Sequence, residues 1–282
     1  MSPLRKQMQA DMVLRGLAAR TQEAYIAAVA GLAGYYNRSP EQLSQEDVQQ
    51  YLLHLIEEHK LSWSTTNQAA CALRFLFHIT LKQPAAEFTI PNRKAPARLP
   101  EILSRDEVHR ILDGCSNLRH RALLMTTYAA GLRVTETCRL KVGDIDSERM
   151  MLRVANGKGG KDRYTLLSPL LLDTLRQYWR TRPSQDWLFP RTDGSQPIGI
   201  SQVQKMYYAA KRRAGVTKAG GIHGLRHAFA THLLEAGVDI HTIGRLMGHD
   251  KITTTARYLH LQGQVARTDS PLDLLSSLLS KR

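Results

Sequence analysis

Apolar residues recur every three or four positions through the N-terminal third of the chain, which is the period of an amphipathic helix. The pattern predicts a first helix over about 3–15, a second after Thr21, a third capped by Ser44, and a fourth that starts at Thr65 or Thr66. Hydroxyl side chains suit these starts because they accept from free N–H groups of the first turn. We therefore expect a bundle of four helices without strands.

A proline-rich segment, 84–100, interrupts this pattern with the sequence PAAEFTIPNRKAPARLP. It holds four of the chain's eleven prolines, which remove backbone donors and disfavour helix in the preceding residue. We interpret the segment as a linker between two domains. Its basic residues Arg93, Lys94 and Arg98 are candidates for contact with a phosphate backbone, and a plain solvated connector is the alternative.

The remainder of the chain reads as helices with one inserted hairpin. Ser104 and Glu107 form the pattern of a capping box, and Asn156-Gly157 is a strong turn signal between two short strand-like runs. We expect strands at 149–155 and 163–167. We expect helices that open at the Ser104 capping box and near 135, and helices at 117–130, 169–180, 201–215, 225–236, 239–247 and 253–259. The predicted fold class is mainly α, with a small β-hairpin or sheet in the second domain.

Charge narrows the function. The 282 residues carry a formal net charge of +14, divided as +3 over 1–100 and +11 over 101–282. Such a basic chain usually binds a polyanion, first of all nucleic acid, although a ribosome-associated protein or a merely basic enzyme would also fit. The sequence shows no long apolar run and no signal-peptide pattern, and its three cysteines are far apart, so we expect a cytoplasmic protein.

Several common chemistries lack their residues. Asp144 and Asp146 form a D-x-D, but they precede a strand and read as turn residues rather than magnesium ligands. The run at 157–161, GKGGK, does not end as a phosphate-binding loop does. His227 and His232 lie five apart without a thiol partner, so packing is favoured over zinc. We expect neither a metal nor another cofactor.

A set of cations and one tyrosine carries the chemistry. His223 and Arg226 lie three apart, His249 follows a glycine, and Tyr258 comes nine residues later; Arg133 stands upstream in GLRVTE. Two guanidiniums can hold the oxygens of a phosphodiester and stabilise charge in its transition state. A phenol can attack phosphorus, and a histidine can accept its proton. These residue types suit phosphoryl transfer without a metal.

Four motifs in this order, GLRVTE, GKGGKDR, HGLRHAFATHLLEAGVDIHTIGRLMGH and TTARYLH, resemble the tyrosine recombinase, or phage integrase, family. The likeness is greatest to its Xer, integron and transposon branches, although 183–199 is too short for the helical insertion of integron integrases. It implies an N-terminal four-helix core-binding (SAM-like) domain over 1–83, the linker 84–100, and a catalytic domain of DNA breaking–rejoining fold over 101–268.

The resemblance also implies a role for each residue. Tyr258 is the nucleophile that forms a 3′-phosphotyrosyl link, and Arg133 and Arg226 hold the scissile phosphate. His223 accepts the proton, His249 hydrogen-bonds the phosphate, and Lys158 is the general acid, with Lys161 as its competitor. Glu136 supports Arg133. Arg212 and Arg213 form either a DNA-contacting patch or a solvated helix face.

The family acts on double-stranded DNA as a tetramer on two sites, without metal or ATP. The leucine-rich tail 269–282 is either a helix folded on its own core or one donated to a neighbouring protomer. Two other functions are open: a tyrosine-type topoisomerase, and a DNA-binding protein of this fold without catalysis. The target site, its spacer and the host process are not encoded in any motif.

Overall fold

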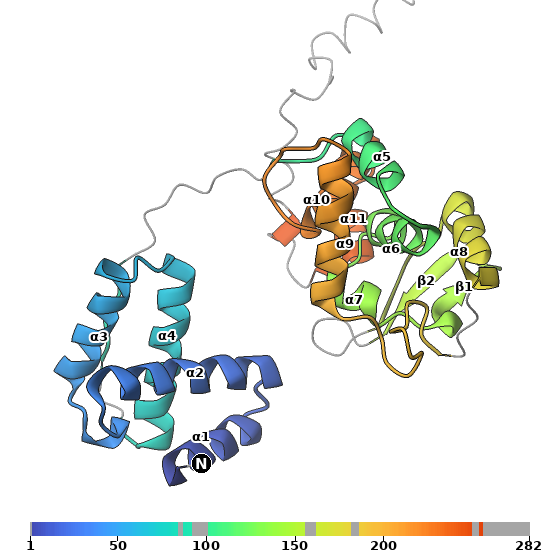
Figure 1. Ribbon diagram of the computed structural model, residues 1–282. Coiled ribbons are helices and arrows are strands. Elements are labelled where there is room, and N and C mark those ends of the chain that lie inside the picture. The colour runs from blue at the N-terminus through green and yellow to red at the C-terminus, as the bar shows by residue number, and fades with distance from the viewer. Residues whose placement is uncertain are drawn as a thin grey trace, which may run out of the picture. The chain divides into compact units, whose positions relative to one another are not determined.

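The computed structural model describes residues 2–83, 87–91, 101–155, 162–181, 186–249 and 254–255. They fall into two units, Met1–Ala97 and Arg98–Arg282, drawn in blue to cyan and in green to orange in Figure 1. Each unit has a hydrophobic core of its own, so each is described separately.

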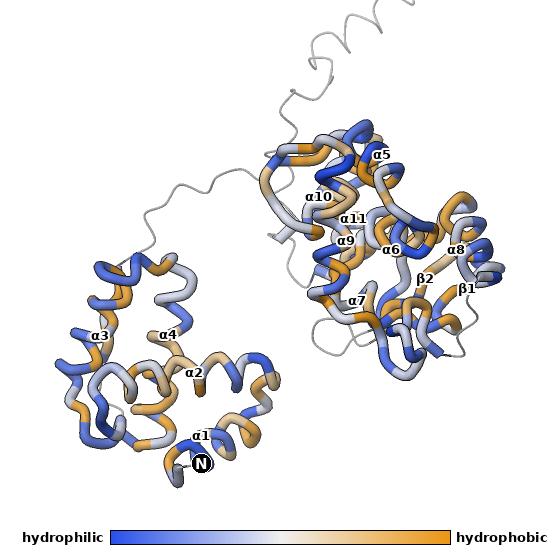
Figure 2. The backbone as a smooth tube through the Cα atoms, in the orientation of Figure 1, coloured by the Kyte–Doolittle hydropathy of each residue, from blue (hydrophilic) through white to orange (hydrophobic). Residues whose placement is uncertain are grey.

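The N-terminal unit is built from helices. Its elements are α1 (Pro3–Leu14), α2 (Ala19–Tyr36), the short η1 (Pro40–Gln42), α3 (Gln45–Glu57), α4 (Trp63–Phe75) and the π-helical η2 (Leu76–Thr80). The core forms where α2 packs against α4, and it includes Leu32, Leu52 and Leu73, all fully buried. Figure 2 shows hydrophilic and hydrophobic residues alternating along α3, as expected for an amphipathic helix at a surface. The predicted four-helix bundle is confirmed within the described residues.

Helix starts were predicted with mixed success. Ser44 does cap α3, since its Oγ accepts from the N–H of Asp47 at 3.1 Å. Thr21 is not a cap, because α2 begins two residues earlier, after Ala18. The start predicted at Thr65 or Thr66 was also wrong: Ser62 is the N-cap of α4 and accepts from the N–H of Thr65. At the start of α4, Ser62, Thr65 and Thr66 all carry a hydroxyl group that can cap a helix, and the sequence alone does not show which of them does.

Part of the predicted linker belongs to the N-terminal unit. Phe88 is buried and its ring packs edge-on against Phe77, with centroids 5.2 Å apart. Gln49 exchanges two hydrogen bonds with the backbone of Thr89, at 2.8 and 2.9 Å. Residues 87–91 are therefore bound to the N-terminal unit and do not form a free connector. The reason is that this segment contains apolar residues, such as Phe88, that pack against the core of the unit. The remaining linker positions, including Arg93, Lys94 and Arg98, lie outside the described residues.

The second unit combines helices with a small sheet. Its elements are α5 (Arg105–Asp113), α6 (Leu118–Ala129), α7 (Val134–Cys138), η3 (Val142–Asp144), β1 (Ile145–Asp146), β2 (Met151–Val154), β3 (Arg163–Leu166), α8 (Pro169–Thr181), α9 (Ile200–Arg213), α10 (His223–Glu235) and α11 (Ile240–Met247). The strands are antiparallel in the order β1-β2-β3, and Val154 pairs with Arg163. The predicted hairpin is confirmed. Asp146 ends the two-residue strand β1, and its Oδ1 accepts from the backbone N–H of Arg149 in the following turn at 2.8 Å, in keeping with the turn role expected of it.

Helix α6 forms the centre of this unit. Its residues Ala122, Leu123 and Leu124 are fully buried, and it contacts α8 and α10 (Figure 1). Leu152 and Val154 bring the inner face of the sheet into the same core. The end of α6, the start of α7, strand β3 and the α10–α11 pair thus meet around one place. None of the helices in the described ranges is long and apolar enough to cross a membrane.

Candidate active site

The motif GLRVTE forms a compact turn at the end of α6. Gly131 has a φ of +61°, and a Cβ there would lie 2.3 Å from Cδ1 of Phe229, so only glycine fits. Arg133 follows as the N-cap residue of α7, and its backbone N–H donates to Oε2 of Glu136 at 2.8 Å. The turn therefore sets both the backbone of Arg133 and the carboxylate that its side chain will meet.

Glu136 gathers three guanidinium groups. Its Oε1 accepts from Nη1 of Arg133 at 2.7 Å and from Nη1 of Arg163 at 2.9 Å. Its Oε2 accepts from Nη2 of Arg163 at 2.7 Å, and Nη1 of Arg226 lies 3.7 Å away. One carboxylate therefore faces three cations, which leaves an excess of positive charge in a poorly solvated place.

The environment keeps Glu136 ionised. Burial raises the pKa of this carboxyl group, but the hydrogen bonds and charge of Arg163, together with the bonds from Arg133, outweigh burial and lower the pKa to about 2. Its side chain is only 7% exposed, so solvent screens these interactions weakly. The sequence-based expectation that Glu136 orients Arg133 matches this geometry, and the carboxylate also holds two further arginines.

Arg226 is the most enclosed of the three arginines. It lies on α10 with 1% of its side chain exposed. Its Nη1 donates to the carbonyl of Gly131 at 2.5 Å, and its Nη2 donates to the carbonyl of Met247 at 2.7 Å and to Nε2 of His249 at 3.1 Å. Arg133 is more open at 26% exposure, and its Nη2 donates to the carbonyl of Gly248 at 3.3 Å. Both arginines therefore donate to backbone carbonyls at the C-terminal end of α11, and Arg226 is the more buried of the two.

His249 is held in a defined tautomer. A guanidinium can only donate, so Nε2 of His249 accepts from Arg226 and the ring proton of the neutral imidazole lies on Nδ1. Nδ1 then donates to Oγ1 of Thr255 at 2.8 Å, and Thr255 is fully buried. Thr255 precedes Tyr258 by three residues, so it links the histidine to the segment that carries the expected nucleophile.

His223 lies at the first position of α10, three residues before Arg226 and exposed to solvent. This spacing places both on one face of the helix. Its ring packs edge-on against His227, with centroids 4.6 Å apart. His223 therefore lies exposed at the start of α10, on the same face as Arg226.

Three of the expected catalytic residues lie outside the described part of the chain: Lys158, Lys161 and Tyr258. Val154 and Arg163 are paired across the ladder, and both lysines fall between these two residues in the sequence. The choice between the two lysines stays a prediction.

Arg163 was not expected at the site. It opens β3, where alternation places it on the same face as Thr165 and Leu167, which are both buried. The sequence does carry a signal for this position, which was missed: a charged residue occupies the same face of the strand as two buried residues.

The expected DNA contacts Arg212 and Arg213 lie away from this cluster on the last turn of α9. Arg213 donates to the carbonyl of Gly114 at 2.6 Å, and Arg212 is exposed.

Other singled-out residues serve the fold. His232 shares a hydrogen bond of 2.9 Å with the hydroxyl of Tyr128, and burial lowers the pKa of its imidazole. Asp144 is buried and accepts from Nε of Arg153 at 3.0 Å and from the backbone of Lys141 at 2.9 Å. Both observations agree with the structural interpretation favoured from sequence.

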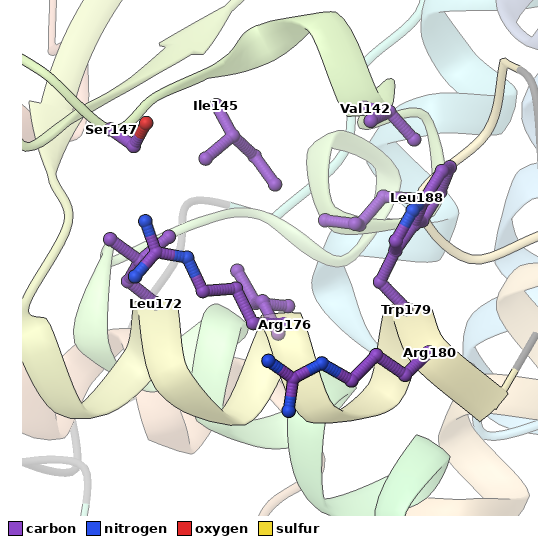
Figure 3. Close-up of a pocket in the computed structure, with 9 residues that line it drawn as sticks. Val142, Ile145, Ser147, Leu172, Arg176, Trp179, Arg180 and Leu188 are labelled. Carbon is purple, nitrogen blue, oxygen red and sulfur yellow. The ribbon is translucent and has the colours of Figure 1, made fainter. Parts of the chain in front are cut away.

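Among the hollows lined by described residues of this unit, two differ in their relation to the cluster. The first, of about 620 Å³, has Glu136 in its wall together with Thr135 and Arg139. The second, of about 430 Å³, lies between β1 and α8. Figure 3 shows its apolar lining and the side chains of Arg176 and Arg180 along it. It contains none of the expected site residues, whereas the first hollow contains Glu136.

Comparison with known proteins adds independent findings. Residues 101–264 match the model described as the phage integrase family, and residues 4–87 match that of the phage integrase N-terminal SAM-like domain. The integrase/recombinase y4qK of Sinorhizobium fredii is 44% identical, covering 98% of this chain and 90% of that protein. An integrase/recombinase of Escherichia coli is 31% identical, over 93% and 91% of the two chains. The tyrosine recombinase XerA of Thermococcus kodakarensis is 36% identical, over 77% of each.

Solved structures agree in fold. The crystal structure of a XerA recombinase is 25% identical with a TM-score of 0.54, covering 99% of this chain and 98% of that one. A lambda integrase dimer bound to a COC′ core site has a TM-score of 0.74 at 18% identity, covering 95% and 98%. A XerH recombinase in a post-cleavage complex with difH has a TM-score of 0.72 at 23% identity, covering 88% and 78%.

Proposed function

Because this chain belongs to the phage integrase family, we propose that it is a site-specific recombinase that cleaves and rejoins DNA strands through a covalent 3′-phosphotyrosyl intermediate. The observation that carries the proposal is the convergence of Arg133, Arg226 and His249 on one place, with a single carboxylate between the guanidiniums. Three guanidiniums against one carboxylate leave the positive charge that a phosphodiester would neutralise.

The chemistry follows from the residue types. The phenolic oxygen of Tyr258 forms a bond to phosphorus while the bond from phosphorus to the 5′ oxygen breaks. The phenolic proton passes to His223, and the departing 5′ oxygen takes a proton from Lys158 or from its competitor Lys161. Arg133 and Arg226 stabilise the charge that develops on the non-bridging oxygens. The phosphotyrosyl ester keeps the energy of the broken bond, so rejoining needs no nucleotide.

His249 would join this grip when DNA binds. In the structure its Nε2 accepts from Arg226, so it cannot donate to a phosphate oxygen in that state. A phosphate oxygen that takes over this N–H of Arg226 would leave Nε2 free to be protonated and to donate.

The partner is double-stranded DNA, and the proposed working assembly is a tetramer on two sites. A lambda integrase tetramer bound to a Holliday junction shares the fold, with a TM-score of 0.73 at 18% identity.

We further propose that 1–83 is a core-binding domain, 101–268 the catalytic domain, and 269–282 a tail that acts on a neighbouring protomer. Deletion of 269–282 should spare DNA binding and impair strand exchange. Normal exchange by the truncated protein would remove the tail from the mechanism. We also propose that the protein is cytoplasmic, because the proposed reaction takes place on DNA.

The test uses a supercoiled plasmid that carries the DNA flanking this gene. Wild type, Tyr258→Phe and the matched control Tyr208→Phe, which removes the hydroxyl of an exposed tyrosine on α9, are incubated in EDTA without ATP and stopped with SDS. We expect protein-linked DNA from wild type and Tyr208→Phe only, with binding unchanged in all three. Covalent product from Tyr258→Phe would refute the assigned nucleophile.

The same experiment separates the two other functions. A topoisomerase would relax plasmids that lack the flanking DNA equally well and would not exchange strands between two sites. A DNA-binding protein without catalysis would shift the DNA at low salt and yield no covalent product. Binding should weaken steeply with salt in every case, because it rests on phosphate contacts.

A further inference from the structure

Arg163 uses every nitrogen of its guanidinium on the site. Nη1 and Nη2 donate to the two oxygens of Glu136 at 2.9 and 2.7 Å, and Nε donates to the carbonyl of Leu246 at 2.9 Å. Its side chain is 11% exposed. These bonds join three segments that are distant in sequence: strand β3, helix α7 and the last turn of α11.

The geometry is specific for arginine. Two parallel N–H groups meeting two carboxylate oxygens fix the plane of Glu136, which a single-point ammonium cannot do. Glu136 then presents its remaining lone pairs to the side chain and backbone of Arg133. Without these two bonds, the hydrogen bonds to Glu136 would come from Arg133, a member of its own turn and the residue that it has to position, with Arg226 at 3.7 Å.

A close contact extends the effect to the other side of the site. Gly248 has a φ of +64°, and a Cβ on it would lie 2.8 Å from Cδ of Arg163. The stem of Arg163 therefore packs against the residue directly before His249. Its position is fixed in turn by the ladder, where it pairs with Val154. Arg163 thus contacts the supports of both Arg133 and His249 from the strand that leaves the lysine-bearing hairpin.

We propose that Arg163 is a positioning residue that fixes Glu136 and the end of α11 together, so that Arg133 and His249 keep a constant position relative to each other. This inference rests on the proposed function, because it assigns Arg163 a part in the same cleavage reaction. Arg163 acts through Glu136 and the α11 end and does not itself contact DNA.

The test compares Arg163→Lys and Arg163→Gln with a matched control, Arg153→Lys. Arg153 lies on the neighbouring strand and also pairs with a buried carboxylate, but with that of Asp144 instead of that of Glu136. For each protein, the rate of covalent complex formation is measured at saturating flanking DNA, alongside the dissociation constant for the same DNA. We expect both Arg163 variants to lose at least 10-fold in rate with affinity within about 3-fold of wild type, and Arg153→Lys to keep both within about 3-fold.

Two further readouts exclude a merely structural role. In Arg163→Ala, added guanidinium ion should restore part of the lost rate, whereas urea, which has a similar shape but no charge, should not. In ¹³C-NMR of the protein without DNA, the titration of Glu136 should move upward from about 2 in Arg163→Gln.

The outcomes separate the inference from its premise. No covalent product from wild type would refute the proposed function. Product from wild type with an undiminished rate in Arg163→Lys and Arg163→Gln would overturn the positioning role alone. A loss that appears in affinity rather than in rate would make Arg163 a DNA contact, which also overturns the proposal.

Discussion

Two buried carboxylates near the β-hairpin do different work. Asp144 has one guanidinium partner, Arg153, and one backbone donor, so its charge is matched and it holds η3 to β2. Glu136 faces three guanidiniums, so the cluster has a net positive charge. The two carboxylates are similarly buried, at 3% exposure for Asp144 and 7% for Glu136. Only Glu136 has more positive charges around it than its own negative charge can neutralise. An excess of buried charge is more informative about function than burial itself.

The largest effect should come from Glu136→Gln, which removes the one carboxylate among three guanidiniums. We expect unfolding free energy to fall by about 3 kcal/mol, since breaking buried ion pairs leaves uncompensated charge. The rate of covalent complex formation should fall about 100-fold. Denaturant unfolding and single-turnover cleavage measure the two effects. Cleavage at the wild-type rate would mean that the excess charge is not part of the site.

Acid should reproduce the loss of charge without a mutation. Because the folded state lowers the pKa of Glu136 from 4.5 to about 2, its contribution to stability is present above pH 4.5 and is lost as pH falls toward 2. The contribution amounts to about 3 kcal/mol at neutral pH. Unfolding curves between pH 7 and 2.5 should therefore be steeper in pH for wild type than for Glu136→Gln. Parallel curves would contradict the shifted pKa.

Asp144→Asn tests the other side of the comparison. The substitution preserves shape and removes the charge that pairs with Arg153, so we expect a loss of about 2 kcal/mol in unfolding free energy. The cleavage rate of the folded protein should stay within about 3-fold of wild type. A rate loss like that of Glu136→Gln would show that both carboxylates serve the reaction.

The smallest effect on stability should come from Thr255→Val, which tests whether the hydrogen-bond network extends to Thr255. Valine keeps the shape but removes the acceptor for Nδ1 of His249, so we expect about 1 kcal/mol of destabilisation and a cleavage rate about 10-fold lower. Thr126→Val is the matched control, because the hydroxyl of Thr126 is also buried but bonds only to the carbonyl of Ala122 in its own helix. The control should lose stability without losing rate, and equal rates in both variants would confine the network to Arg226 and His249.

Sequence reasoning succeeded where the signal is local. Ser44 and Ser104 lie three residues from the backbone groups that they cap, and Asn156-Gly157 lies between the two strands that it joins. GLRVTE also needs only its own six residues to form the turn and the bond between Arg133 and Glu136. The failures at Thr21 and Thr65 concern boundaries, where neighbouring residues offer nearly equal free energy.

Arg163 and Thr255 show where such reasoning stops. Arg163 meets Glu136 across 27 residues, and Arg226 meets Gly131 across 95, so neither pairing leaves a periodic trace in the chain. Thr255 is the last of the three adjacent threonines 253–255, and only its burial against Gly244 and His249 distinguishes it.

The amino-acid sequence by itself determined the mainly helical fold, the hairpin, and the set of arginines, histidines and tyrosine from which the chemistry is drawn. Those features follow from periodicity, capping and spacing, which act between near neighbours. The tertiary structure alone decided that one carboxylate would hold three guanidiniums, that His249 would carry its proton on Nδ1, and that Arg163 would join strand to helix end. Those features depend on side chains that meet only after the core of α6 has brought distant segments together, because charge and hydrogen bonds act over a few ångströms in space, whatever the separation along the chain.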